Sequence, residues 1–362
     1  MWLDEQFAPQ HGRTDPVGPG RANASMPGGC NGLSVRAFTL LELLVSTALL
    51  IILVGITVGI ISATQGVWRR ASAQVEQFRA ARQAFESVSS RIAQATLNPY
   101  WTVTQDAQGQ PMRYERASEL RFRLGTASAL VPGAAEGGSA VFFQSPTGFF
   151  SDGSGDLGVA LNTWGYFVEY GSDKSYRPAF LAAAGVPERY RFRLVEFLDP
   201  SDQLAVFKYT SGNSSYTGGD WFSAPLGTAG HKRILADNVI ALVVLPKLSS
   251  LEDSTGFALA PDIDYDSTTR LPSPALNPRN QLPPVLEIAA VVVSDRSAER
   301  ITWGSAPPDF GVSLTTLFRK AELMESDLAK LRDALLAKGL DARIFRLSVP
   351  LPSARWSVEQ TN

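Results

Sequence analysis

Residue types that support catalysis or metal binding are scarce in this sequence. Its 362 residues include one cysteine, which excludes a metal site built from several thiolates, and two histidines, which leave little room for histidine-rich metal chemistry. His231 lies in the polar segment 230–233 and is the histidine around which a Ser–His–Asp triad would have to form. No nucleophile elbow, P-loop, zinc-binding helix motif or dinucleotide fingerprint accompanies it. We therefore expect a protein that is not an enzyme.

Three alternating carboxylates form the one candidate metal site. Asp262, Asp264 and Asp266 place an oxygen ligand at every second residue, and calcium prefers several oxygens from one short loop. The segment lacks the glycine and the closing glutamate of an EF-hand loop. A solvated acidic loop is the simpler explanation, so we expect no cofactor, with calcium at this loop as the alternative.

The charge balance restricts the class of partner. The chain has 33 Lys and Arg against 35 Asp and Glu, a formal net charge of −2. A protein that coats nucleic acid needs a basic excess to neutralise phosphate, so we expect no nucleic-acid partner. With 44% hydrophobic and 19% charged residues, the chain has enough apolar side chains for a folded core.

One apolar segment determines the predicted topology. Residues 43–67 contain no charged side chain, and a helix of this length reaches about 37 Å at about 1.5 Å per residue. Because a hydrocarbon core is about 30 Å thick, the segment predicts a single transmembrane helix. Glu42 lies at its edge, where a carboxylate is costly unless it pairs with a cation or reaches the headgroups. Arg36, Arg69 and Arg70 flank both ends and leave the orientation open.

The residues around Glu42 resemble a known processing signal. Residues 34–42, Ser-Val-Arg-Ala-Phe-Thr-Leu-Leu-Glu, are similar to the class III leader of type IV pilins and pseudopilins. The resemblance implies that a prepilin peptidase cuts between Ala37 and Phe38 on the cytoplasmic side and methylates the new amino terminus. It also implies that Glu42, then the fifth residue, pairs with the amino terminus of a neighbouring subunit. The family usually has Gly before the cut, where this chain has Ala37.

Further segments resemble larger pilin-like proteins. Residues 67–70, 95–101 and 190–197 are similar to the Verru_Chthon cassette protein C family, and segments 235–239 and 282–288 resemble those of J-type minor pseudopilins of type II secretion. This implies a structural subunit of a type IV pilus or a type II secretion-like filament. The implied partners are other pilin-like subunits, prepilin peptidase, an inner-membrane assembly platform and membrane lipid. The implied location is the bacterial inner membrane, spanned once, with a cytoplasmic N-terminus and a periplasmic C-terminal domain.

The expected organisation has three parts, a leader at 1–37, a helix at 38–97 and a β-rich ectodomain at 98–362. Past the apolar segment the helix becomes amphipathic, because apolar residues recur at helical spacing. That stripe consists of Val75, Phe78, Phe85, Val88 and Ile92. Together with the resemblance, these features predict an α+β, pilin-like fold in which the long helix packs on a mostly antiparallel sheet.

Alternating and apolar runs predict the strands of the ectodomain. They are 119–124, 140–144, 164–170, 189–198, 204–209, 238–245 and 285–293. A late helix is predicted from apolar residues spaced three and four apart and closed by Gly339. Its stripe consists of Leu317, Ala321, Met324, Leu328, Leu331 and Leu335. Residues 342–351 alternate again and predict a final strand.

Two other functions are compatible with the same residues. In the first, the chain is a single-pass anchored ectodomain that binds a glycan or protein partner without filament assembly, through aromatic residues such as Trp164, Tyr166 and Trp221. Ordinary sheet packing explains these aromatic residues equally well. In the second, it is a membrane-anchored enzyme that uses His231 or the acidic loop.

Overall fold

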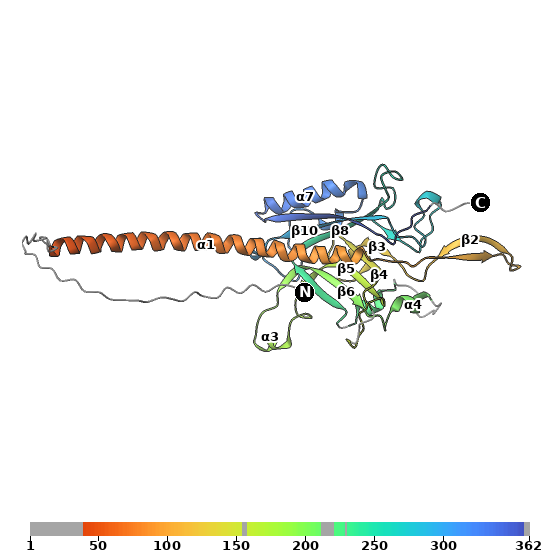
Figure 1. The fold of residues 1–362 in the computed structure, drawn as a ribbon, viewed down its shortest axis with the longest axis horizontal. Helices are drawn as coiled ribbons and strands as arrows, with labels where there is room; N and C mark the ends of the chain where they lie inside the picture. The colour runs from red at the N-terminus through yellow and green to blue at the C-terminus, as the bar shows by residue number, and fades with distance from the viewer. Residues whose placement is uncertain (1–38, 154–157, 211–220, 229, 358–362) are drawn as a thin grey trace, which may run out of the picture. The chain divides into compact units, whose positions relative to one another are not determined.

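The first helix is the longest element of the chain. The computed structural model describes residues 39–153, 158–210, 221–228 and 230–357. The chain divides into two compact units, with the boundary between Thr64 and Gln65 inside helix α1, Leu40–Ile92 (Figure 1). The segment Leu40–Arg69 is long and apolar enough to cross a membrane, and none of its apolar window is buried. The prediction of one helix suited to spanning a membrane is therefore confirmed for the described residues.

The larger sheet of the second unit has six antiparallel strands in the order β7-β6-β5-β4-β3-β9. The strands are Arg123–Thr126 (β3), Ser139–Pro146 (β4), Leu161–Ser172 (β5), Tyr190–Asp199 (β6), Lys232–Asp237 (β7) and Tyr265–Asp266 (β9). Aromatic residues favour such pleated, buried surfaces, and Phe142, Trp164 and Phe197 of the central strands are fully buried.

A second antiparallel sheet has three strands in the order β11-β10-β8. The strands are Val239–Lys247 (β8), Val285–Val293 (β10) and Ala342–Pro350 (β11). Strand β8 packs against β4, β5 and β6, and the Val244 N–H donates a hydrogen bond to Ser139 Oγ at 3.3 Å. The two sheets therefore share one hydrophobic core.

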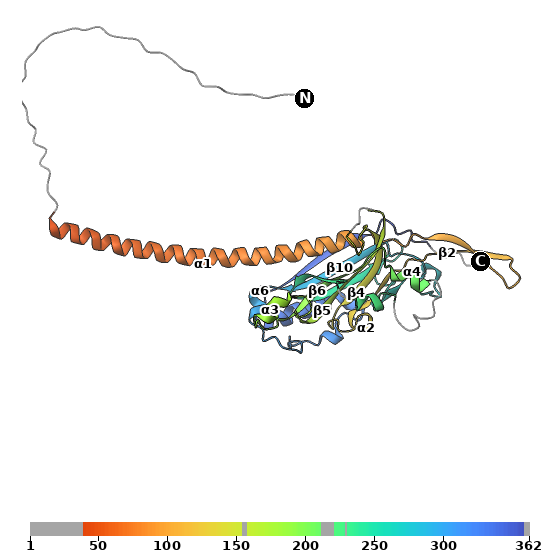
Figure 2. The same ribbon diagram turned by 90° about the horizontal axis from the view of Figure 1, so that it is seen from below.

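A separate hairpin of β1 (Tyr100–Gln105) and β2 (Pro111–Ala117) follows α1 in the chain. It extends away from the two larger sheets of its unit (Figures 1 and 2). Its turn is closed by Asp106, whose carboxylate accepts the backbone N–H groups of Gln108 and Gln110 at 2.9 and 2.8 Å. Such Asx turns are a standard way to close a short loop.

Helix α7, Met324–Ala337, lies along β11 (Figure 1). Its leucine stripe faces the core, because Leu328, Leu331 and Leu335 are fully buried. Gly339 ends the helix with φ 74°, and the Leu340 N–H donates to the Leu335 carbonyl at 3.0 Å, as in a glycine C-cap. The remaining helices are short: α2 (Ala127–Leu130), α3 (Ala179–Ala183), α4 (Ala205–Thr210), α5 (Ser223–Leu226), α6 (Asp295–Glu299) and the 3-10 turns Pro274–Leu276, Leu314–Thr316 and Ala321–Leu323.

The C-terminal part of α1 belongs to the core of the second unit. Phe85, Val88 and Ile92 are buried, and the rings of Phe85 and Phe345 on β11 lie 6.3 Å apart. The predicted apolar stripe is confirmed at these three positions. Its first two side chains, at residues 75 and 78, lie outside the described part of the chain.

The predicted α+β class with antiparallel sheets is confirmed, and so are most of the long strands. Strands β4, β5, β6, β8, β10 and β11 match, within one residue where the bounds fall short, the predicted runs at 140–144, 164–170, 189–198, 238–245, 285–293 and 342–351. The late helix is confirmed in type, but it begins at Met324 because Phe318 has a left-handed φ of 56° and its N–H donates to Asp327 Oδ2.

Other predictions were wrong. A strand was predicted at 204–209, but Ala205–Thr210 forms helix α4, because the buried Asp199 carboxylate accepts the Ala205 N–H at 2.9 Å and caps the start of a helical turn. Strand β3 begins at Arg123 instead of at 119. Helix α1 ends at Ile92, since the chain turns there and the Thr96 N–H bonds to the Gln144 carbonyl on β4 at 2.9 Å. The hairpin and strand β7 were not predicted.

Candidate functional site

The start of α1 places Glu42 in the first helical turn. Thr39 precedes the helix, and its Oγ1 accepts the Glu42 backbone N–H at 3.2 Å. This is half of a capping box, in which Thr and a Glu three residues later satisfy free donors at a helix start. The Glu42 carboxylate lies at the positive end of the helix dipole, which favours an anion. Ala37 and Phe38, the residues of the predicted cut, lie outside the described residues.

The apolar part of α1 satisfies its own polar side chains. The hydroxyls of Ser46, Thr57 and Thr64 each donate to the carbonyl four residues earlier, at 2.7 to 2.8 Å. Such bonding is what a helix needs in lipid, where no water replaces a missing partner. At Gly55 and Gly59, no atom of the described residues lies within 4 Å of the place where a Cβ would be. Small residues at this spacing let a second helix approach closely in a membrane.

A buried ion-pair cluster fixes the other end of α1. Arg91 pairs with Glu196 of β6, and Arg233 of β7 pairs with the same carboxylate. The Arg91 guanidinium also lies over the Trp164 ring, 4.2 Å from its centroid, and the Tyr166 hydroxyl donates to Glu196 at 3.1 Å. Glu196 is 1% exposed. The cluster therefore ties the helix to two strands of the six-stranded sheet.

Burial shifts the pKa values of two groups in this cluster. Burial lowers the pKa of the Arg91 guanidinium and raises the pKa of the Tyr166 phenol, because a low-dielectric surrounding disfavours each charged form. Arg91 lies off the apolar stripe of α1, as do Arg82 and Glu86. Those two side chains are exposed and pair with each other at 2.8 Å, whereas the Arg91 side chain is 21% exposed and packs over Trp164.

His231 lies near a buried carboxylate. Its Nδ1 is 3.8 Å from Asp199 Oδ1, which is too long for a hydrogen bond, and neither atom has a hydrogen-bond partner among the described residues. Burial raises the pKa of the Asp199 carboxyl, while the N–H of Ala205 and the nearby His231 act against that shift. The pair has two residue types of a catalytic triad without the hydrogen bond that orients the imidazole.

The acidic segment after residue 261 has separate partners for each carboxylate. Asp262 pairs with Lys320, Asp264 pairs with Arg123, and Asp266 accepts the N–H and hydroxyl of Thr268. Among the described residues no group of three or more His, Cys, Asp or Glu is placed to hold a metal ion. Each of the three carboxylates is therefore already bonded to another group of the same chain.

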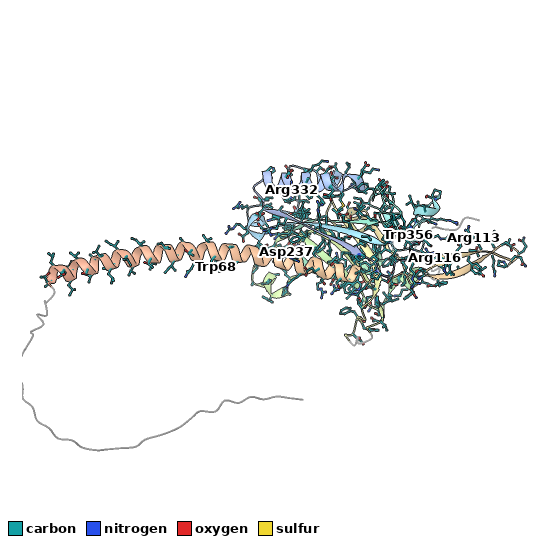
Figure 3. All side chains as sticks on the ribbon, turned by 45° about the horizontal axis from the view of Figure 1, so that its top comes forward. Trp68, Arg113, Arg116, Asp237, Arg332 and Trp356 are labelled. Atoms are coloured by element: carbon teal, nitrogen blue, oxygen red, sulfur yellow. The ribbon has the colours of Figure 1, made fainter. Side chains whose placement is uncertain are left out.

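The aromatic residues considered as a binding surface are in the core. Trp164, Tyr166 and Trp221 are at most 2% exposed, so sheet packing accounts for them. Exposed aromatic side chains occur elsewhere, among them Trp101 and Tyr114 on the hairpin, which are 65% and 74% exposed. Figure 3 labels Arg116 on the same hairpin, and its guanidinium lies 5.4 Å from the Trp101 ring centroid.

Two features of α1, its capped first turn and its pair of exposed glycines, were not predicted, although the sequence carries a local signal for each. The order Thr39-x-x-Glu42 is a capping-box pattern, and Gly55-x-x-x-Gly59 is the small-residue pattern of close helix pairs. The Arg91 cluster has no local signal, because Glu196 and Arg233 join it only through sheet pairing. Comparisons of the chain with protein-family models, with characterised proteins and with solved structures returned no match.

Proposed function

We propose that this chain is a membrane-anchored, pilin-like structural subunit that assembles through α1, in a pilus or a secretion-type filament. The observation that carries the proposal is one uninterrupted helix whose first turn holds Glu42, whose middle is apolar and exposed, and whose end is fixed in a folded core. A helix fixed at one end and apolar at the other suits a subunit whose apolar part packs with those of its neighbours.

Glu42 supplies the register of assembly in this proposal. A carboxylate near the membrane interior is costly alone, and it becomes favourable when an ammonium group pairs with it. Removal of residues 1–37 creates such an ammonium group at Phe38. The amino terminus of one subunit then pairs with Glu42 of the next, and the open faces of Gly55 and Gly59 allow the helices to approach.

The first test is the amino terminus of the protein recovered from a membrane fraction. We expect a chain that begins with N-methylated Phe38, because a prepilin peptidase cuts the leader after Ala37. Intact-mass and terminal-peptide mass spectrometry measure this directly. The variant Ala37→Trp serves as the control and should keep its leader, since a bulky residue does not fit a pocket for a small one. An intact leader in the natural chain, or a cut after residue 67, contradicts the proposal and favours an anchored ectodomain without a filament.

A second test addresses Glu42 itself. We expect Glu42→Ala to be processed normally but to enter filaments at least about tenfold less, which corresponds to a loss of about 1.4 kcal/mol. The measurement compares the amount in sheared, sedimented filaments with the amount in membranes. Glu86→Ala is the matched control, because this exposed carboxylate on the same helix makes only a surface ion pair. Equal incorporation of Glu42→Ala and the natural chain rules out the pairing role.

A further inference from the structure

The loop between β5 and β6 carries an exposed apolar segment. Residues 178–187 read Pro-Ala-Phe-Leu-Ala-Ala-Ala-Gly-Val-Pro and contain no polar side chain. All of them except the half-buried Leu181 are exposed, with Phe180 at 67% and Val186 at 42%. We call this segment, which includes α3, the apolar tip. An uninterrupted run of exposed apolar residues is unfavourable in water and normally marks a functional contact.

The base of the loop holds the apolar tip in one conformation. The Asp173 N–H donates to the Arg189 carbonyl, and the Asp173 carboxylate accepts the Arg189 N–H, both at 3.0 Å. Arg177 Nη1 donates to the carbonyls of Val186 and Pro187 at 2.9 and 3.1 Å. The apolar side chains are therefore presented by a preformed loop.

The charges at this base largely compensate one another. Arg177 lies 3.9 Å from Asp173, and Lys174 lies 3.8 Å from Glu188. With Arg189, the base has three cations against two anions. Because the excess is a single charge, the base does not select a strongly charged partner, and the contact surface is the apolar tip itself.

The backbone of the apolar tip satisfies most of its own hydrogen-bond donors. Four of its N–H groups donate to carbonyls of the same segment at 2.9 to 3.1 Å, those of Leu181, Ala184, Gly185 and Val186. Its two prolines have no N–H. A backbone donor without an internal partner is costly in lipid, where no water replaces the bond. The apolar tip is therefore suited to contact with hydrocarbon.

The second unit also contains the end of the apolar part of α1. The segment Leu40–Arg69, which is suited to spanning a membrane, continues past the unit boundary after Thr64. Trp68 near its end is 62% exposed, and Trp is enriched where a bilayer meets water. Within the second unit, α3 lies at the end from which α1 leaves the two sheets toward residue 65 (Figures 1 and 2). The unit that presents the apolar tip is thus also the unit that reaches the bilayer.

We infer that the apolar tip inserts into the surface of the bilayer that α1 spans and forms a second membrane contact of the chain. Phe180, Leu181 and Val186 enter the boundary between headgroups and acyl chains, and the charged base of the loop stays in water. This inference rests on the membrane anchor of the proposed function, but not on leader cleavage or filament assembly.

The test uses the full chain with Cys30→Ser, so that one introduced cysteine is the single thiol. Ala183→Cys in the apolar tip carries a bimane label, and the protein is reconstituted in phosphatidylcholine vesicles that contain lipids with a nitroxide at known acyl depths. We expect contact quenching that places the label at a depth of about 5–10 Å in the headgroup–acyl boundary. The same label at Leu251→Cys is the site control and should not be quenched, although Leu251 is 97% exposed.

Two substitutions, each combined with the label at residue 183, test whether the apolar side chains cause the insertion. Phe180→Asp should abolish the lipid quenching, because a carboxylate in the apolar boundary is costly. Val159→Asp makes the same kind of change at another exposed apolar residue, which is 81% exposed, and should leave the quenching unchanged. Quenching that survives Phe180→Asp, or equal quenching at residues 183 and 251, overturns the inference.

A label at Ile52→Cys, inside the apolar segment of α1, reports the anchor independently. Lipid quenching at residue 52 without quenching at residue 183 overturns the inference and leaves the anchor in place. Quenching at neither position overturns both. A label at residue 183 that is shielded from aqueous iodide but not quenched by lipid identifies a contact with a second copy of the chain, which also overturns the inference.

Discussion

Replacing Glu196 by alanine is expected to lower the free energy of unfolding of the second unit by about 3–5 kcal/mol, since removal of one partner leaves buried charge uncompensated. Arg91 is 21% exposed at its side chain and would lose its carboxylate, and the Tyr166 hydroxyl would lose its acceptor. Urea unfolding of the detergent-solubilised chain measures the change. Tryptophan fluorescence is a suitable signal because Trp164 lies directly under Arg91.

The control for this prediction is Glu325→Ala. Glu325 also pairs with an arginine, Arg346, but both side chains are exposed, at 61% and 42%. Surface ion pairs of this kind contribute about 0–1 kcal/mol. If Glu196→Ala were no more destabilising than Glu325→Ala, the cluster at the end of α1 would not be an anchor, and the apolar contacts of Phe85 and Ile92 would hold the helix alone.

The second large effect is expected at Gly165 on β5. A Cβ at this position would lie 2.5 Å from Phe142 Cδ1 and 3.2 Å from Phe197 Cδ1. The Phe142 ring has no room to move, because it stacks on Phe222 with centroids 3.6 Å apart. We therefore expect Gly165→Ala to destabilise the protein by about 3 kcal/mol, near the upper end of the usual cost of overpacking a core.

Gly171 provides the comparison on the same strand. No atom of the described residues lies within 4 Å of its Cβ position, so Gly171→Ala should change stability by no more than about 0.5 kcal/mol. Thermal unfolding of both variants beside the natural chain distinguishes overpacking from the general effect of replacing a strand glycine. Equal destabilisation by the two substitutions would show that close approach to Phe142 is not the cause.

Periodicity explains why the long elements could be predicted from the sequence. The apolar segment within α1, the leucine stripe of α7 and the runs of β8 and β10 each follow one repeat over many residues. Such patterns depend only on which face is buried. The antiparallel arrangement also followed, because few helices separate the strands.

Local patterns failed where a single side-chain contact decides the structure. Residues 204–209 have the pattern of a strand, yet the carboxylate of Asp199 accepts the Ala205 N–H and starts helix α4. Arg91 lies off the apolar stripe, yet its guanidinium packs over Trp164 and pairs with the buried Glu196. Neither partner can be identified from spacing, since both are brought to Arg91 by the pairing of the sheet.

The candidate site residues also differ in whether the sequence alone could predict their positions. The position of Glu42 in a first helical turn could be predicted, because Thr39 and the apolar run lie beside it in the sequence. The alternation of Arg189, Arg191 and Arg193 at the start of β6 is also visible in the sequence. The carboxylate partner of Arg193 is not, because Asp237 ends β7 and only the pairing of β6 with β7 brings it within 3.3 Å of Arg193.

The contact between Phe85 on the first helix and Phe345 on the last strand has a kinetic consequence. Contacts between residues far apart in the sequence form slowly, because a long loop must close first. During synthesis, the Phe85 side chain gains its contact with β11 only after Ala342–Pro350 has emerged, more than 250 residues later. We therefore expect this apolar contact of α1 to form among the last contacts of the second unit.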